Sequence, residues 1–73
     1  MTLNNLKKGD SAVITEINAS RELKNRFNSF GLVKGAKVLS KERSLAKKTI
    51  EVKVNKTSIS MRASEAELVE IVQ

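Results

Sequence analysis

Three carboxylates near the C-terminus, Glu65, Glu67 and Glu70, are the residues best placed for chemistry. Carboxylates can bind a metal ion or act as general acids and bases. Ferrous iron favours sites that include histidine, and this chain of 73 residues contains no histidine and no cysteine. Glu65 and Glu67 also have a structural explanation, because Ser64 and Glu67 have the spacing of a helix capping box. We therefore expect no metal site and no cofactor.

The composition also argues against catalysis. Without histidine or cysteine the chain lacks the nucleophilic triads, the nitrogen and sulfur ligands of zinc, and the usual ligands of haem. The sequence contains no glycine-rich phosphate loop. The length suits one small domain, residues 1–73, with little room for a concave site. We expect that the protein is not an enzyme.

The strong positive charge indicates an anionic partner. Lysine and arginine number 14 against 8 acidic residues, so the formal net charge is +6. This charge suits an acidic protein surface, anionic lipid headgroups or a nucleic acid. Proteins that bind single-stranded nucleic acid usually stack bases on exposed aromatic rings, and here only Phe27 and Phe30 are aromatic, both predicted to face the core. A basic small barrel that binds nucleic acid remains the alternative function.

The periodicity of apolar residues predicts a mainly β protein with one inserted helix. Residues 11–17, 36–40, 50–54, 58–62 and 69–71 alternate or are rich in β-branched residues, which is typical of strands. In the first strand Ala12 and Ile14 are assigned to the core, and Ile17 joins them after a slip in register. Residues 44–48 form the expected tip of a hairpin, and residues 55–56 a tight turn. Five strands this short are expected to curl into a barrel without free edges.

A helix is predicted after Ser20. Leu23, Phe27 and Phe30 are spaced four and three apart, so they share one helical face that must pack on the sheet. Ser20 can cap the first turn. Gly31 follows the last apolar residue and suits the left-handed position that ends many helices.

The stretch at residues 23–35, LKNRFNSFGLVKG, resembles the signature L-x-x-R-L-x-x-L-G-L-x-x-G of FeoA-type domains. Two phenylalanines replace the usual leucines. Upstream, residues 3–9 fit the family spacing, and downstream the strand I-S-M-R at 59–62 and the closing E-A-x-x-V-x-I fit as well. We assign structural roles to the residues of the family motifs: Leu23, Arg26, Phe27, Phe30, Gly31, Gly35, Arg62 and Ala66.

The resemblance implies a small SH3-like β-barrel of five to six strands with an inserted short α-helix. It also implies a cytoplasmic accessory protein of bacterial ferrous iron uptake that contacts the membrane transporter FeoB. The protein would reach the inner face of the membrane only through this partner, and a homo-oligomer is compatible with the sequence. The hairpin at residues 46–49 lacks the glycine and proline common in the family. The same domain type occurs in metal-dependent repressors, but this chain has no room for a DNA-binding domain.

Candidate contacts with the transporter are apolar or basic residues around the helix and the hairpin. Of Leu32 and Val33, one is expected in the core and the other on the surface, where it could serve docking. The basic residues are expected to point outward if the apolar face of the helix points inward. The candidate partner-binding residues are Arg21, Lys24, Leu32, Val33, Lys47 and Lys48.

Overall fold

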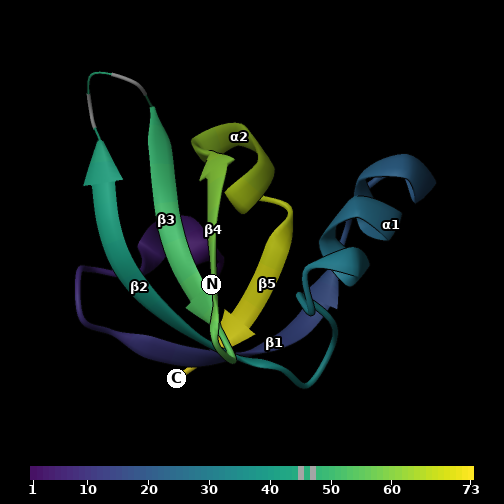
Figure 1. The fold of residues 1–73 in the computed structure, drawn as a ribbon, viewed down its shortest axis with the longest axis horizontal. Coiled ribbons are helices and arrows are strands. Elements are labelled where there is room, and N and C mark those ends of the chain that lie inside the picture. The colour runs from purple at the N-terminus through teal and green to yellow at the C-terminus, as the bar shows by residue number, and fades with distance from the viewer. Residues whose placement is uncertain (45, 47) are drawn as a thin grey trace.

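A computed structural model describes residues 1–44, 46 and 48–73; nothing is described for Leu45 and Lys47. Within the described residues the chain forms five strands, two α-helices and one short 3-10 helix (Figure 1). In chain order the elements are η1 (Leu3–Asn5), β1 (Ser11–Ile17), α1 (Arg21–Ser29), β2 (Lys37–Ser44), β3 (Thr49–Val54), β4 (Thr57–Arg62), α2 (Ala63–Ala66) and β5 (Val69–Val72).

The five strands form one antiparallel sheet in the order β4-β3-β2-β1-β5. The sheet curls strongly, and its register shifts at one point in the β1–β5 ladder and at another in the β2–β3 ladder. Such irregularities increase the local bend and twist of a strand. The expected fold of a small, mainly β barrel with an inserted helix is therefore confirmed, with five strands.

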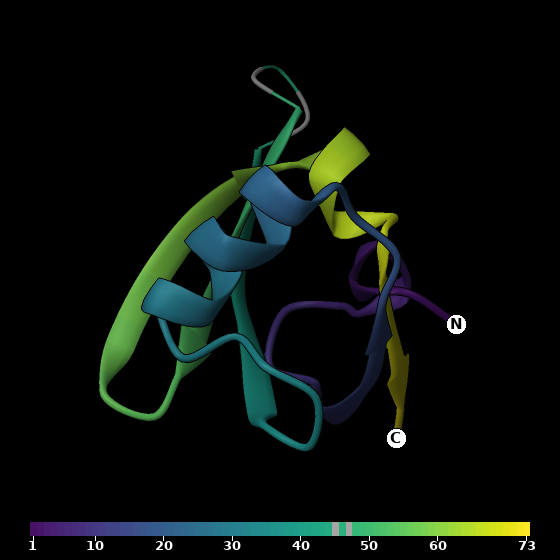
Figure 2. The same cartoon turned by 90° about the vertical axis from the view of Figure 1, so that its right-hand side faces the viewer.

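The expectation that the barrel has no free edges is wrong. The strands β4 and β5 end the sheet and do not pair with each other. They are joined by the four-residue helix α2, and α1 lies across the open side between them (Figure 2). Phe27 of α1 is buried in the core, so the helix covers the core between the two strands that a closed barrel would pair.

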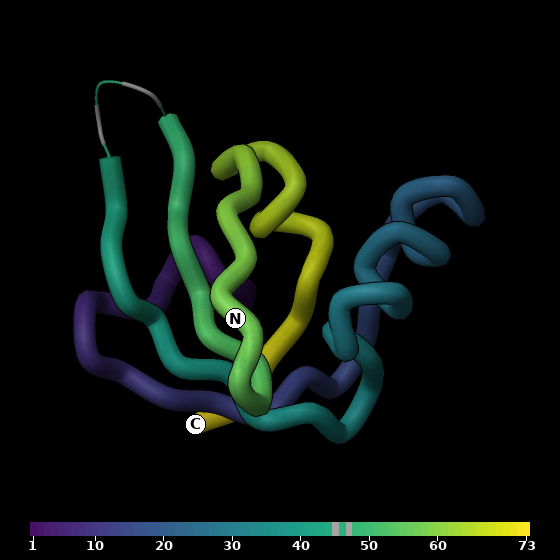
Figure 3. The backbone as a smooth tube through the Cα atoms, in the orientation of Figure 1, coloured from purple at the N-terminus to yellow at the C-terminus, as the bar shows by residue number. Residues whose placement is uncertain are grey.

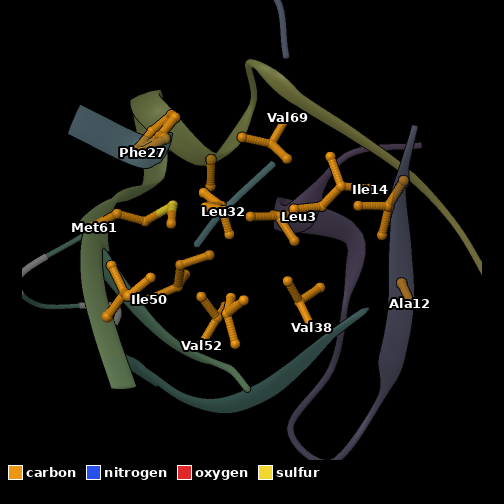
Figure 4. Close-up of a cluster of buried hydrophobic side chains, with 14 of the residues drawn as sticks. Leu3, Ala12, Ile14, Phe27, Leu32, Val38, Ile50, Val52, Met61 and Val69 are labelled. Carbon is orange, nitrogen blue, oxygen red and sulfur yellow. The ribbon is translucent and has the colours of Figure 1, made fainter. Parts of the chain in front are cut away.

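The core consists of the alternating apolar residues that the sequence predicts. In β1 the buried residues are Ala12, Ile14 and Ile17, and the register shift lies between positions 14 and 16, as expected. The side chains of η1, the strands and the segment after α1 meet in one cluster (Figure 4). The core is therefore formed by residues far apart in the sequence, and it fixes the position of α1.

Two local predictions need correction. The strand predicted at residues 36–40 is longer and runs from Lys37 to Ser44 as β2. Its ladder with β3 continues to the pair of Ser44 and Thr49. The predicted capping box of Ser64 and Glu67 is wrong: the cap lies two residues earlier, at Arg62, whose N–H donates to Oε1 of Glu65 at 3.1 Å. The predicted hairpin tip includes Leu45 and Lys47, which lie outside the described residues.

Candidate functional site

The first turn of α1 presents two cations to solvent. Ser20 caps the helix as predicted, because its Oγ accepts a hydrogen bond from the Leu23 N–H at 3.3 Å. Arg21 and Lys24, one turn apart, are exposed. In the described part of the chain no carboxylate lies within ion-pair distance of either side chain. Both charges are therefore available to an external partner.

The end of α1 decides which of its neighbours is buried. The Gly31 N–H donates to the Asn28 carbonyl and the Leu32 N–H to the Phe27 carbonyl, each at 3.0 Å. This is the pattern of a Schellman motif, and Gly31 has the left-handed φ of +87° that the motif requires. The predicted role of Gly31 is thereby confirmed.

After this motif the side chain of Leu32 is buried and that of Val33 is exposed. The chain reverses so that Leu32 is 0% exposed, beside Phe27 in the core, whereas Val33 is 39% exposed (Figure 4). Leu32 is therefore wrong as a candidate contact, because its side chain cannot reach a partner. Val33 remains a candidate.

The position of Phe30 contradicts the sequence prediction. Phe30 shares its helical face with Leu23 and Phe27, yet its side chain is 41% exposed, Leu23 is half-buried, and Phe27 alone is fully buried. The reason is that Phe30 is the C-cap residue, and the core position next to Phe27 is taken by Leu32. The aromatic argument against nucleic-acid binding therefore holds for Phe27 only. The signal for this outcome was present in the sequence, since a Schellman motif places an apolar residue after its glycine against the helix.

One flank of α1 brings two predicted contacts together. Lys24 and Asn28 line a surface hollow of about 330 Å³ with Val33, Lys34 and the end of β1. We call this depression the Lys24 hollow. It combines the exposed side chain of Val33 with two lysines and one carboxylate, Glu16, so cations outnumber anions in its lining. This balance suits a partner surface that is acidic and partly apolar.

The other flank of α1 is a groove against strand β4. Arg26, Phe27 and Phe30 form its helical wall, and residues 57–61 of β4 form the opposite wall, around a volume of about 450 Å³. We call it the α1–β4 groove. Two of the β4 residues that line it, Ile59 and Met61, are buried in the core. Sequence reasoning missed this groove, since it depends on the exposure of Phe30 and on the open edge of the sheet.

An ion pair connects α1 with α2 at the end of this groove. Nη2 of Arg26 lies 2.8 Å from Oε2 of Glu65 in α2, and the other Glu65 oxygen accepts from the Arg62 backbone. Arg26 thus contacts the chain itself, as its structural assignment expects. Ala66 is buried below α2, and Gly35 has a φ of +91° where its N–H donates to the Ile14 carbonyl.

The hairpin does not belong to the surface around α1. Lys48 directly precedes β3, and this end of β2 and β3 is well separated from α1 in the backbone trace (Figure 3). The other predicted hairpin contact, Lys47, lies outside the described residues. Among the described candidates, Lys48 is therefore apart from the surface around α1, which combines charge with exposed apolar groups.

The described residues offer little for metal or acid–base chemistry. Among them no three acidic, histidine or cysteine side chains converge to hold a metal ion, so Glu65, Glu67 and Glu70 do not form a cluster. Outside the site, a hydrogen bond and ionic contact with Glu42 raise the pKa of Lys8. No described helix has the length and apolar character needed to cross a membrane.

Comparison with known proteins gives consistent results for sequence and fold. The model of the FeoA domain matches residues 1–73. A Campylobacter jejuni protein named Fe(2+) transport protein A is 41% identical over 71 residues, covering 97% of this chain and 96% of that protein. A solution structure of FeoA from Chlorobium tepidum superposes with a TM-score of 0.91 at 35% identity, covering 97% of this chain and 68% of that one.

A crystal structure of FeoA from Stenotrophomonas maltophilia adds the fold name. It was solved in complex with zinc and is described as a prokaryotic SH3 domain protein. It has a TM-score of 0.83 at 28% identity, covering 99% of this chain and 89% of that chain. The fold expected from the motifs is thus confirmed. The described chain, with its FeoA signature folded into a curled sheet and helix α1, belongs to the FeoA family of ferrous iron transport proteins.

Proposed function

We propose that this chain is a cytoplasmic accessory protein that docks on the cytosolic part of a FeoB-type ferrous iron transporter and modulates its assembly or activity. The observation that carries the proposal is the surface around α1. There Arg21 and Lys24 are exposed and have no ion-pair partner among the described residues, and Lys24 shares a hollow with the exposed Val33. The family is named for ferrous iron transport.

Charge and packing support docking through this surface. Exposed cations without a partner in their own chain attract an acidic surface and increase the rate of encounter. Exposed apolar side chains at the centre of such a surface add affinity when water is removed from them. Val33 and Phe30, on opposite flanks of α1, supply these apolar contacts. The membrane would be reached through the transporter.

The proposal can be tested with a charge-reversed pair of variants. Arg21→Glu combined with Lys24→Glu is compared with Lys37→Glu combined with Lys53→Glu, a matched control on the outer face of β2 and β3. Both double variants change the net charge of +6 by the same amount. Affinity for the detergent-solubilised transporter of the same organism is measured by a titration at fixed salt, with thermal unfolding as the check of folding.

We expect the α1 variant to lose at least about tenfold in affinity while the control variant loses about threefold or less. Equal losses would show that only net charge matters and would remove α1 from the interface. Absence of binding by the parent chain would overturn the proposal. If the parent chain instead retains RNA or DNA that nuclease removes, the alternative function of a basic nucleic-acid-binding barrel replaces it.

A further inference from the structure

The two edges of the sheet are treated differently by the chain. At β5 the N-terminal segment covers the edge, because the Ile71 N–H donates to the Met1 carbonyl at 2.9 Å and Thr2 pairs with Glu70. Among the described residues, β4 pairs with β3 alone. An edge strand presents a row of unpaired backbone groups, and proteins usually protect it with lysine, proline, a bulge or a covering helix or loop. The central residues of β4, Ser-Ile-Ser-Met, include neither lysine nor proline nor a bulge, and a groove separates them from α1.

The register of the β3–β4 hairpin identifies the free backbone groups. Residues 55–56 form a two-residue turn, so Val54 and Thr57 are a hydrogen-bonded pair. Bonded and non-bonded pairs then alternate along an antiparallel ladder. Ser58 and Ser60 fall in non-bonded pairs, and their N–H and C=O groups therefore point away from β3. The same rule turns the Arg62 N–H outward, where Glu65 accepts its hydrogen bond.

The α1–β4 groove runs along this edge. Its lining includes five successive residues, 57–61. Successive side chains of a strand point to opposite faces, so a groove that touches all five lies beside the strand and not on one face of it. Across the groove lie Arg26, the buried Phe27 and the exposed Phe30. The outward groups of Ser58 and Ser60 therefore face a groove whose other wall carries one exposed aromatic ring.

We infer that the α1–β4 groove receives an extended segment of the partner, which adds to β4 as a sixth strand. Its backbone would pair with the free groups of Ser58 and Ser60, and an apolar side chain would pack beside Phe30. Strand addition takes affinity from main-chain hydrogen bonds and specificity from pockets for alternate side chains, and this edge offers both. The inference rests on the proposed function, since the segment belongs to the transporter.

A proline and alanine pair at position 60 tests this contact. Ser60→Pro removes the outward N–H and fills its place with the ring, yet removes no bond of the β3–β4 ladder. Ser60→Ala removes the hydroxyl and keeps the N–H. We expect Ser60→Pro to weaken binding of the solubilised transporter by about tenfold or more, and Ser60→Ala to change it by about twofold or less. Thermal unfolding checks that both variants fold.

Amide-resolved hydrogen exchange of the parent chain gives a second readout that needs no variant. Free, the amides of Ser58 and Ser60 should exchange fast, whereas those of Ile59 and Met61, bonded to β3, should exchange slowly. Bound to the transporter, all four should be slow. A helix or a flat surface docking on α1 would not produce this change at alternate residues of β4.

The outcomes separate the two proposals. If the transporter binds but Ser60→Pro binds equally well and Ser58 and Ser60 stay fast, strand addition is refuted while docking stands. If the parent chain does not bind, both fall. If Ser58 and Ser60 become slow in the chain alone as its concentration rises, together with dimers in sedimentation, the added strand is a second copy of β4 and the inference of a transporter strand is overturned.

Discussion

Replacing Leu32 should destabilise the fold far more than replacing its neighbour Val33. Leu32 has no exposed surface and lies among Phe27 and the residues of the sheet, whereas Val33 is 39% exposed. Truncating a buried leucine to alanine removes its transfer free energy and leaves a cavity, at a cost of about 2–5 kcal/mol. Truncating a half-exposed valine changes the free energy of unfolding by about 0.5 kcal/mol or less.

These magnitudes are large for so short a chain. At about 0.05–0.15 kcal/mol per residue, 73 residues have a free energy of unfolding of about 4–11 kcal/mol. Urea unfolding of a domain this size has a slope of about 1 kcal/mol per molar. We therefore expect Leu32→Ala to lower the midpoint by about 2–5 M, and Val33→Ala to lower it by about 0.5 M or less. Leu32→Val, which removes one methylene, should lower it by about 1 M and remains measurable if the alanine variant does not fold.

Comparing the midpoint shifts of the two alanine variants tests whether the end of α1 directs Leu32 into the core. Equal shifts for Leu32→Ala and Val33→Ala, or a shift below about 1 M for Leu32→Ala, would mean that the Schellman motif does not direct Leu32 into the core. Affinity for the transporter gives the complementary readout, since Val33→Ala should weaken docking although the fold is intact. Unchanged affinity would remove Val33 from the interface.

Further predictions concern the helix end, the ion pair and metal binding. Gly31→Ala should cost about 1–2 kcal/mol, because alanine is strained at the left-handed φ of +87°. The new Cβ would lie 3.5 Å from Nδ2 of Asn55, which is an ordinary contact, so no clash adds to this cost. An unchanged thermal midpoint would contradict this prediction. A double-mutant cycle on Arg26 and Glu65 should give a coupling free energy below about 1 kcal/mol, since the arginine side chain is 53% exposed. Glu65→Ala alone should lower the free energy of unfolding more than Arg26→Ala does, because it also leaves the Arg62 N–H without its acceptor. Anaerobic calorimetric titration with Fe(II) should show no tight stoichiometric binding, and a one-to-one isotherm would overturn that expectation.

Much of the fold followed from local patterns. Alternation in the strands predicted which side chains are buried, because a strand covered on one face must place its apolar residues at every second position. Ser20 and Gly31 predicted both ends of α1, since a cap and a left-handed residue satisfy backbone groups that the helix leaves unpaired. These features depend on neighbours within a few residues.

The errors arose where distant segments compete for the same space. Phe30 matches the apolar face of α1 as well as Phe27 does, but the core has room for one of them and for Leu32. The spacing of residues in a helix cannot decide which side chain a curved sheet will cover. For the same reason Ser64 and Glu67 fit a capping box, whereas the strand before them places Arg62 at the cap and Glu65 within reach of Arg26.

The sequence by itself determined the absence of histidine and cysteine, the order of the elements, the FeoA signature and the basic charge. Each of these is a property of residue types and short spacings. The tertiary structure alone decided that β4 is an edge strand beside a groove, that Phe30 is exposed there and that Lys24 and Val33 line one hollow. These depend on how far the sheet closes and where α1 packs against it. Closure and packing are set by the volume of the whole core, which short-range spacing does not specify.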